Sequence, residues 1–128
     1  MKIVGFMVLA VLSAACSNIT FDGLQFDRYV SVYEKAGQMQ TQCTEAGTKP
    51  SFRVEVKQLQ EMTSHMSTYA DFRSNSPEVK IAAGKIALMV SELSHKYENG
   101  QPNVGYCQEK LANIRDGAKV ISSTLGAQ

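Results

Sequence analysis

The sequence of 128 residues predicts an all-α fold: a four-helix up-down-up-down bundle with one disulfide, after a cleaved signal peptide. Three observations predict this fold. Apolar residues recur every three or four positions in four successive stretches, glycine, proline and asparagine separate the stretches, and no stretch alternates apolar and polar residues as a half-buried strand does. We therefore divide the chain into a signal peptide over 1–15, a tether over 16–23 and a helical bundle domain over 24–128.

Residues 1–15 have the composition of a secretory signal peptide. Lys2 supplies a short positive region, and residues 3–12 form an uncharged apolar stretch that is too short to span a bilayer as a helix. Ser13, Ala14 and Ala15 form a small-residue cleavage site. We expect cleavage between Ala15 and Cys16.

Residues 12–16, which read LSAAC, resemble the lipobox of bacterial lipoprotein precursors. The sequence departs from the commonest form because Ser13 stands where leucine is usual, and the aliphatic residue lies four places before the cysteine. The resemblance implies that Cys16 becomes the first residue of the mature chain and carries a diacylglycerol and an N-acyl group. Several acyl chains anchor a protein durably to a membrane. Ser17 in the next position implies delivery to the outer membrane, with the protein on the periplasmic face.

The alternative is ordinary signal-peptidase cleavage, which leaves a soluble secreted protein with a free thiol at Cys16. The cysteine count favours lipidation. The chain has three cysteines, and acylation of Cys16 leaves the even pair Cys43 and Cys107.

The first helix is expected over 24–44 and the second over 51–72, with a break at Gly47, Lys49 and Pro50. The predicted apolar stripe of the first helix comprises Phe26, Tyr29, Val30, Tyr33, Ala36, Gln40 and Cys43, and that of the second comprises Phe52, Val56, Leu59, Met62, Met66 and Tyr69.

The third helix begins with Ser76 as N-cap, Pro77 in the first helical position and Glu78 in the first turn. Residues 99–102 end it, and the fourth helix opens near Asn103. The predicted stripe of the third helix comprises Val79, Ala82, Ala83, Ile86, Val90, Leu93 and Tyr97, and that of the fourth comprises Val104, Cys107, Leu111, Ile114, Ala118, Ile121 and Leu125.

Cys43 and Cys107 are predicted to form the disulfide. In an up-down-up-down bundle the end of the first helix and the start of the fourth lie at the same end on adjacent helices. A bridge that closes a loop of about 65 residues contributes on the order of 4 kcal/mol in the chain-entropy model. The alternative is a link from one of these cysteines to another subunit. The tether lies at the opposite end, so the bridged end would project into the periplasm.

The sequence lacks the residues that nucleic-acid binding and metal or haem ligation require. Lys and Arg (13) and Asp and Glu (12) are balanced and scattered, which argues against a nucleic-acid partner. His65 and His95 lie at different heights in the bundle, about 16 Å apart along the helix axes, so they do not share a metal with each other. Met39 could be one ligand of a haem, but the second ligand would be a histidine on the fourth helix, and that helix has none. Glu92 and His95 form one Glu-x-x-His motif, whereas a di-iron bundle needs two such motifs.

We therefore expect no metal, no cofactor and no enzymatic activity. Met62, Met66 and Met89 are interpreted as core residues, with a partner-binding surface as the alternative. Glu92 and Lys96 are expected to pair on the face of one helix.

The architecture resembles the pilotins, which are small helical lipoproteins that escort subunits of secretion channels. The resemblance rests on the lipobox, the helical bundle and the pair Cys43 and Cys107. It implies a lipid-anchored accessory protein of the outer membrane that faces the periplasm and binds a protein partner. The alternatives are a phage- or plasmid-encoded lipoprotein for lysis, such as an outer spanin subunit, or for superinfection or entry exclusion, and a periplasmic inhibitor or immunity protein.

Overall fold

The computed structural model of the chain describes residues 22–44, 50–74 and 76–126. These residues form four α-helices and no strand, as the sequence predicts: α2 (Gly23–Gln40), α3 (Pro50–Arg73), α4 (Pro77–Glu98) and α5 (Val104–Gly126). The proposed signal peptide, the cleavage site at Ala15 and the lipidation site at Cys16 lie outside the described residues. In the part of the chain that the structure covers, none of the helices has the length and apolarity to cross a membrane.

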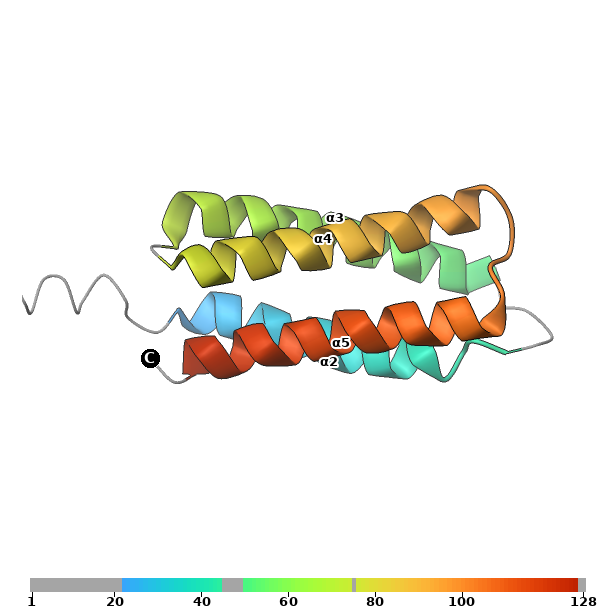
Figure 1. The fold of residues 1–128 in the computed structure, drawn as a ribbon, viewed down its shortest axis with the longest axis horizontal. Helices are drawn as coiled ribbons and strands as arrows, with labels where there is room; N and C mark the ends of the chain where they lie inside the picture. The colour runs from blue at the N-terminus through green and yellow to red at the C-terminus, as the bar shows by residue number, and fades with distance from the viewer. Residues whose placement is uncertain (1–21, 45–49, 75, 127–128) are drawn as a thin grey trace, which may run out of the picture.

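The four helices pack as two pairs, α2 with α5 and α3 with α4 (Figure 1). Within the first pair the helices run in opposite directions, since Phe26 lies beside Gly126 at one end and Cys43 beside Cys107 at the other. α3 and α4 also run in opposite directions (Figure 1). The pairs join mainly through α4 and α5, and the interface between α2 and α3 is the smallest of the four. The bundle is therefore most loosely closed along α2 and α3.

The helix ends follow local hydrogen bonding. Asp22 caps α2, because its Oδ1 accepts a bond of 3.1 Å from the amide of Gln25. Ser76 caps α4 as predicted, and its Oγ accepts from the amide of Val79 at 3.3 Å. Asn103 Oδ1 accepts from the amide of Tyr106 at 2.7 Å and starts α5. These caps satisfy amides that have no partner inside the first turn of a helix.

The expected end of the first helix at residue 44 is wrong. α2 ends at Gln40, and the amides of Thr41, Gln42 and Cys43 donate to carbonyls three residues back in a tightened last turn. Cys43 therefore follows the helix instead of lying on it, although its side chain is buried.

The core is formed by one buried stripe from each helix, and the predicted stripes of α4 and α5 agree with it closely. Of those residues only Ala82 and Val104 are partly buried. The stripe predicted for α2 is rotated from the true one, because Val32 and Met39 are buried while Val30, Tyr33 and Gln40 are not.

α3 differs from its predicted stripe in a smaller way. Thr63 and Ala70 are buried, whereas Met62 and Tyr69 are only half-buried. Thr63 can lie inside because its hydroxyl donates to the carbonyl of Leu59 at 2.8 Å, so no polar atom of the side chain is left without a partner.

Candidate functional site

The disulfide pair lies in a buried cluster at one end of the bundle. Cys43 and Cys107 are at disulfide-bonding distance, with their Cα atoms 5.9 Å apart, and their side chains are 3% and 1% exposed. The Tyr97 hydroxyl lies 3.3 Å from the sulfur of Cys107, and the Phe52 ring packs at 5.2 Å from the Tyr97 ring. Gln108 donates to the carbonyl of Cys43 at 3.3 Å. The cluster is packed like a structural cross-link, since both cysteines are almost fully buried.

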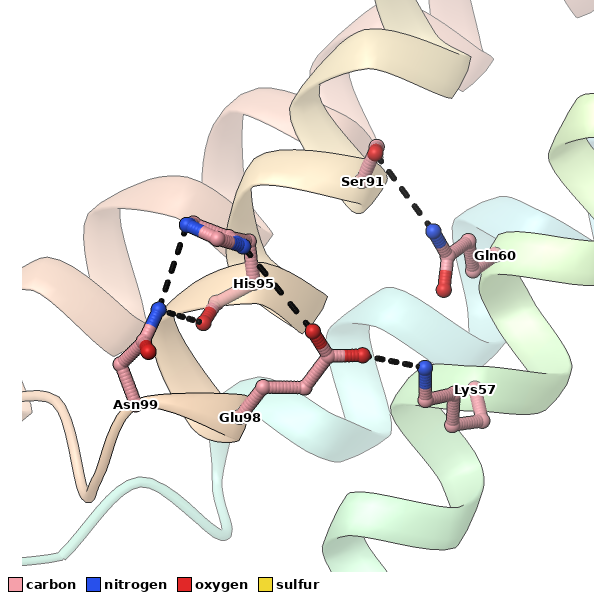
Figure 2. Close-up of polar contacts among 6 residues, drawn as sticks. All are labelled: Lys57, Gln60, Ser91, His95, Glu98 and Asn99. Carbon is pink, nitrogen blue, oxygen red and sulfur yellow. Dashed lines mark hydrogen bonds and ion pairs between the residues drawn. The ribbon is translucent and has the colours of Figure 1, made fainter.

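His95 belongs to a polar cluster between α3 and α4, drawn in Figure 2. Its Nδ1 lies 3.9 Å from Glu98, and its Nε2 lies 3.2 Å from the side-chain amide nitrogen of Asn99. Ser91 lies on the same helix, but its hydroxyl accepts instead from Gln60 at 3.5 Å. A histidine activates a serine through a direct hydrogen bond, and here the second ring nitrogen faces Asn99. The cluster is thus not arranged as a nucleophile with its base.

The polar cluster joins two helices electrostatically. Glu98 Oε1 accepts from Lys57 Nζ at 2.5 Å, and the hydrogen bond and charge of Lys57 hold the pKa of Glu98 below its usual value. Both side chains are half-exposed, so water and salt screen the pair and it contributes little to stability.

The other residues singled out from the sequence lie apart from one another. Met39 is fully buried in the core, and His65 is exposed on α3. Met66 is buried, while Met62 and Met89 pack against the core from its edge. Across the described ranges, no group of three or more histidine, cysteine or acidic side chains is placed to hold a metal ion.

The expected pair of Glu92 and Lys96 is wrong. Glu92 forms its ion pair with Lys110 of α5, and Lys96 lies over the ring of Tyr106 at 5.4 Å. The neighbouring helix offers each side chain a closer partner than its own helix does. Pairing between helices cannot be read from spacing along one helix.

An open groove runs along the seam of α2 and α5, and we call it the α2–α5 groove. It consists of two shallow depressions of about 560 Å³ and 580 Å³ that meet at Tyr33. Apolar atoms form most of the wall in both depressions, although most of the residues around the second carry polar side chains. The first includes Phe26, Val30, Tyr33, Lys119, Ser122 and Gly126, and the second includes Tyr33, Glu34, Gly37, Gln38, Thr41 and Arg115.

The groove explains the rotated stripe of α2. Val30 and Tyr33 were expected inside the bundle, but they form the outer wall of the groove, and Tyr33 is 37% exposed. The apolar residues of α2 thus cover a wider arc than the core uses. That excess width is the signal in the sequence that indicates a second apolar surface.

The groove contains two basic side chains, Arg115 and Lys119, and only Arg115 forms polar contacts with neighbouring residues among those described. Arg115 donates to Gln40 at 3.0 Å and lies 3.6 Å from Asp116. Lys119, in the apolar part, forms no ion pair with the residues that the structure describes. A cation beside an apolar wall favours a ligand that is apolar with one acidic group.

Comparison with protein-family models, with curated proteins and with solved structures finds no match to this chain.

Proposed function

We propose that this chain is a lipid-anchored accessory protein of the outer membrane that faces the periplasm and binds a protein partner as a pilotin-like adaptor. In this proposal the helices form an up-down-up-down bundle. Acylated Cys16 holds the end of the bundle where α2 begins at the membrane. The α2–α5 groove receives an amphipathic helix of the partner. The groove is the observation that carries the proposal.

The shape and lining of the groove support a helical ligand. From Phe26 the groove follows α2 to its end at Gln40, about 21 Å at 1.5 Å per residue, and continues to Thr41, which matches a helix of about 15 residues. Phe26, Val30 and Tyr33 have the spacing of one helix face and contact solvent in the free protein. An amphipathic helix binds such a surface through its apolar face. An acidic side chain at its edge would pair with Lys119.

The groove is tested by crosslinking in intact cells with a photoreactive amino acid at position 123. Ser123 is exposed and borders the apolar part of the groove. We expect one dominant protein adduct, and we expect Tyr33→Glu to reduce it about tenfold, since a buried charge at the contact costs at least 1.4 kcal/mol.

The matched control for this test is Leu88→Glu. Leu88 lies on α4 and is 60% exposed, so this variant adds the same charge to another face of the bundle. The adduct should persist in Leu88→Glu. Equal loss in the two variants would contradict binding in the groove.

The anchor is tested separately with Cys16→Ala. Acylation needs the sulfur of Cys16, so the variant should lose labelling by a lipid probe and appear in the soluble periplasmic fraction. Cys43→Ser serves as the control, because it removes a thiol and leaves the proposed lipidation site intact. Continued membrane retention of Cys16→Ala would refute the lipoprotein assignment.

A further inference from the structure

A second, smaller pocket lies on the other flank of α2, at the loosely packed interface with α3. It has a volume of about 100 Å³ and is more enclosed than the α2–α5 groove. Pockets for drug-sized ligands measure roughly 300 Å³ or more, so this pocket fits only a small group. Its lining consists of Leu24, Gln25, Arg28, His65, Met66 and Tyr69.

Gln25 is the buried polar residue of this pocket. It is 4% exposed, and its side-chain nitrogen has no hydrogen-bond partner within the described part of the chain. A buried donor without a partner costs about 1–3 kcal/mol. The protein therefore retains a group that an incoming acceptor would satisfy.

Arg28 adds a positive charge to the same pocket. It is half-buried and forms no ion pair with any residue that the structure describes. The nearby carboxylate of Asp22 is already used, because one oxygen accepts from the amide of Gln25 at 3.1 Å and the other accepts from the hydroxyl of Tyr69 at 2.8 Å. Among the residues described, the amide of Gln25 and the guanidinium of Arg28 are thus two donors without acceptors in one small cavity.

We propose that this pocket binds a carboxylate on a short apolar stem. The amide and guanidinium groups would bind the two carboxylate oxygens through charge-assisted hydrogen bonds. Leu24 and Met66 would contact the stem. The site is separate from the α2–α5 groove, because it uses the opposite flank of α2, and it does not depend on the function proposed above.

The test is an NMR titration of the full-length chain with butyrate, observing the side-chain amide of Gln25 and the methyl group of Met66. Saturable shifts at both groups are expected with butyrate. Butyramide has nearly the same shape without the charge and should bind at least about tenfold more weakly. Shifts that do not saturate, or equal binding of the two compounds, would overturn the proposal.

Two variants and one control connect the binding to these residues. Arg28→Gln and Gln25→Leu should each weaken butyrate binding about tenfold. Gln25→Leu removes the unpartnered amide and so leaves the fold intact. Arg53→Gln is the control, since Arg53 is exposed near the far end of α3, and it should bind as the wild type does. Wild-type binding by Gln25→Leu would also overturn the proposal.

The source of the carboxylate is distinguished by a second probe. N-acetylvaline represents the C-terminus of a peptide, whereas butyrate represents a free short-chain acid. Tighter binding of N-acetylvaline assigns the site to a peptide end, and tighter binding of butyrate assigns it to a free acid. If neither probe binds, the proposal that this pocket binds a carboxylate is wrong.

Discussion

Two buried polar atoms without partners lie one turn apart on α2, the Gln25 amide nitrogen and the Tyr29 hydroxyl. Within the described residues they are the only buried side-chain nitrogen or oxygen atoms in this state. Gln25 lines the small pocket and Tyr29 does not. A ligand in the small pocket would therefore not reach the hydroxyl of Tyr29, and burying this hydroxyl without a partner lowers stability.

Tyr29→Phe should keep or raise stability. The substitution retains the ring in a side chain that is 1% exposed and removes the unpartnered hydroxyl. We expect a change between zero and about +1 kcal/mol in the free energy of unfolding, measured by urea denaturation. A loss of several kcal/mol would show that the hydroxyl has a partner.

Tyr29 also predicts how stability falls at alkaline pH. Burial raises the pKa of Tyr29 from 10.0 to about 12. The unfolded chain releases this proton near its ordinary pKa and the folded chain keeps it, so stability present below pH 10 is lost as the pH rises toward 12. The loss is about 2–3 kcal/mol for a shift of this size. Denaturation at several pH values should show a smaller alkaline loss of stability in Tyr29→Phe than in the wild type, and an equal loss in the two proteins would contradict this role of Tyr29.

At the scale of the helix, Asp22 joins the start of α2 to the end of α3. One carboxylate oxygen caps α2 through Gln25, and the other accepts from Tyr69 at 2.8 Å. The pKa of Tyr69 is raised, and this hydrogen bond is the largest cause, ahead of burial and of the negative charge of Asp22. α2 and α3 share the smallest interface of the bundle, and two side-chain contacts link them: Asp22 with Tyr69, and the ion pair of Lys35 with Glu55 at 2.7 Å.

Asp22→Ala should destabilise the protein by about 1–2 kcal/mol, because it removes a helix cap and leaves Tyr69 without this acceptor. Asp22→Asn keeps the cap and should lose less. Urea denaturation measures both changes, and absorbance titration should show the pKa of Tyr69 moving back toward its usual value in Asp22→Ala. Wild-type stability in Asp22→Ala would contradict this role.

The helices and most of the core could be predicted because their signals are local. Ser76 and Pro77 mark the start of α4, and aliphatic residues repeat at strict helical spacing along α4 and α5. α2 has no such clear stripe, since Gln25 points inward while Val30 and Tyr33 remain at the surface. The wide apolar arc of α2 indicates a second apolar surface, but the positions of the groove and the pocket could not be predicted, because each depends on which neighbouring helix α2 faces on either flank.

At the scale of the whole molecule, the disulfide should supply a large part of stability. It connects residues 64 positions apart, and such a link contributes about 4 kcal/mol by restricting the unfolded chain. Urea denaturation with reductant should show a loss of that order relative to the oxidised protein. The double variant Cys43→Ser with Cys107→Ser should be less stable to the same extent and unchanged by reductant. An oxidised wild type that is no more stable than this variant would contradict the prediction.

The two helix pairs also set the order in which the chain can assemble. α3 and α4 are separated by a few residues, so their contact closes a short loop at little entropic cost. α2 and α5 flank that hairpin, and they meet only after the ends of the chain are brought together. The Cys43–Cys107 link keeps the facing ends of α2 and α5 close even in the denatured chain, so the oxidised protein refolds without the entropic cost of bringing these two ends together. The disulfide should therefore speed refolding. The reduced chain should refold more slowly than the oxidised chain, because α2 docks onto α5 late.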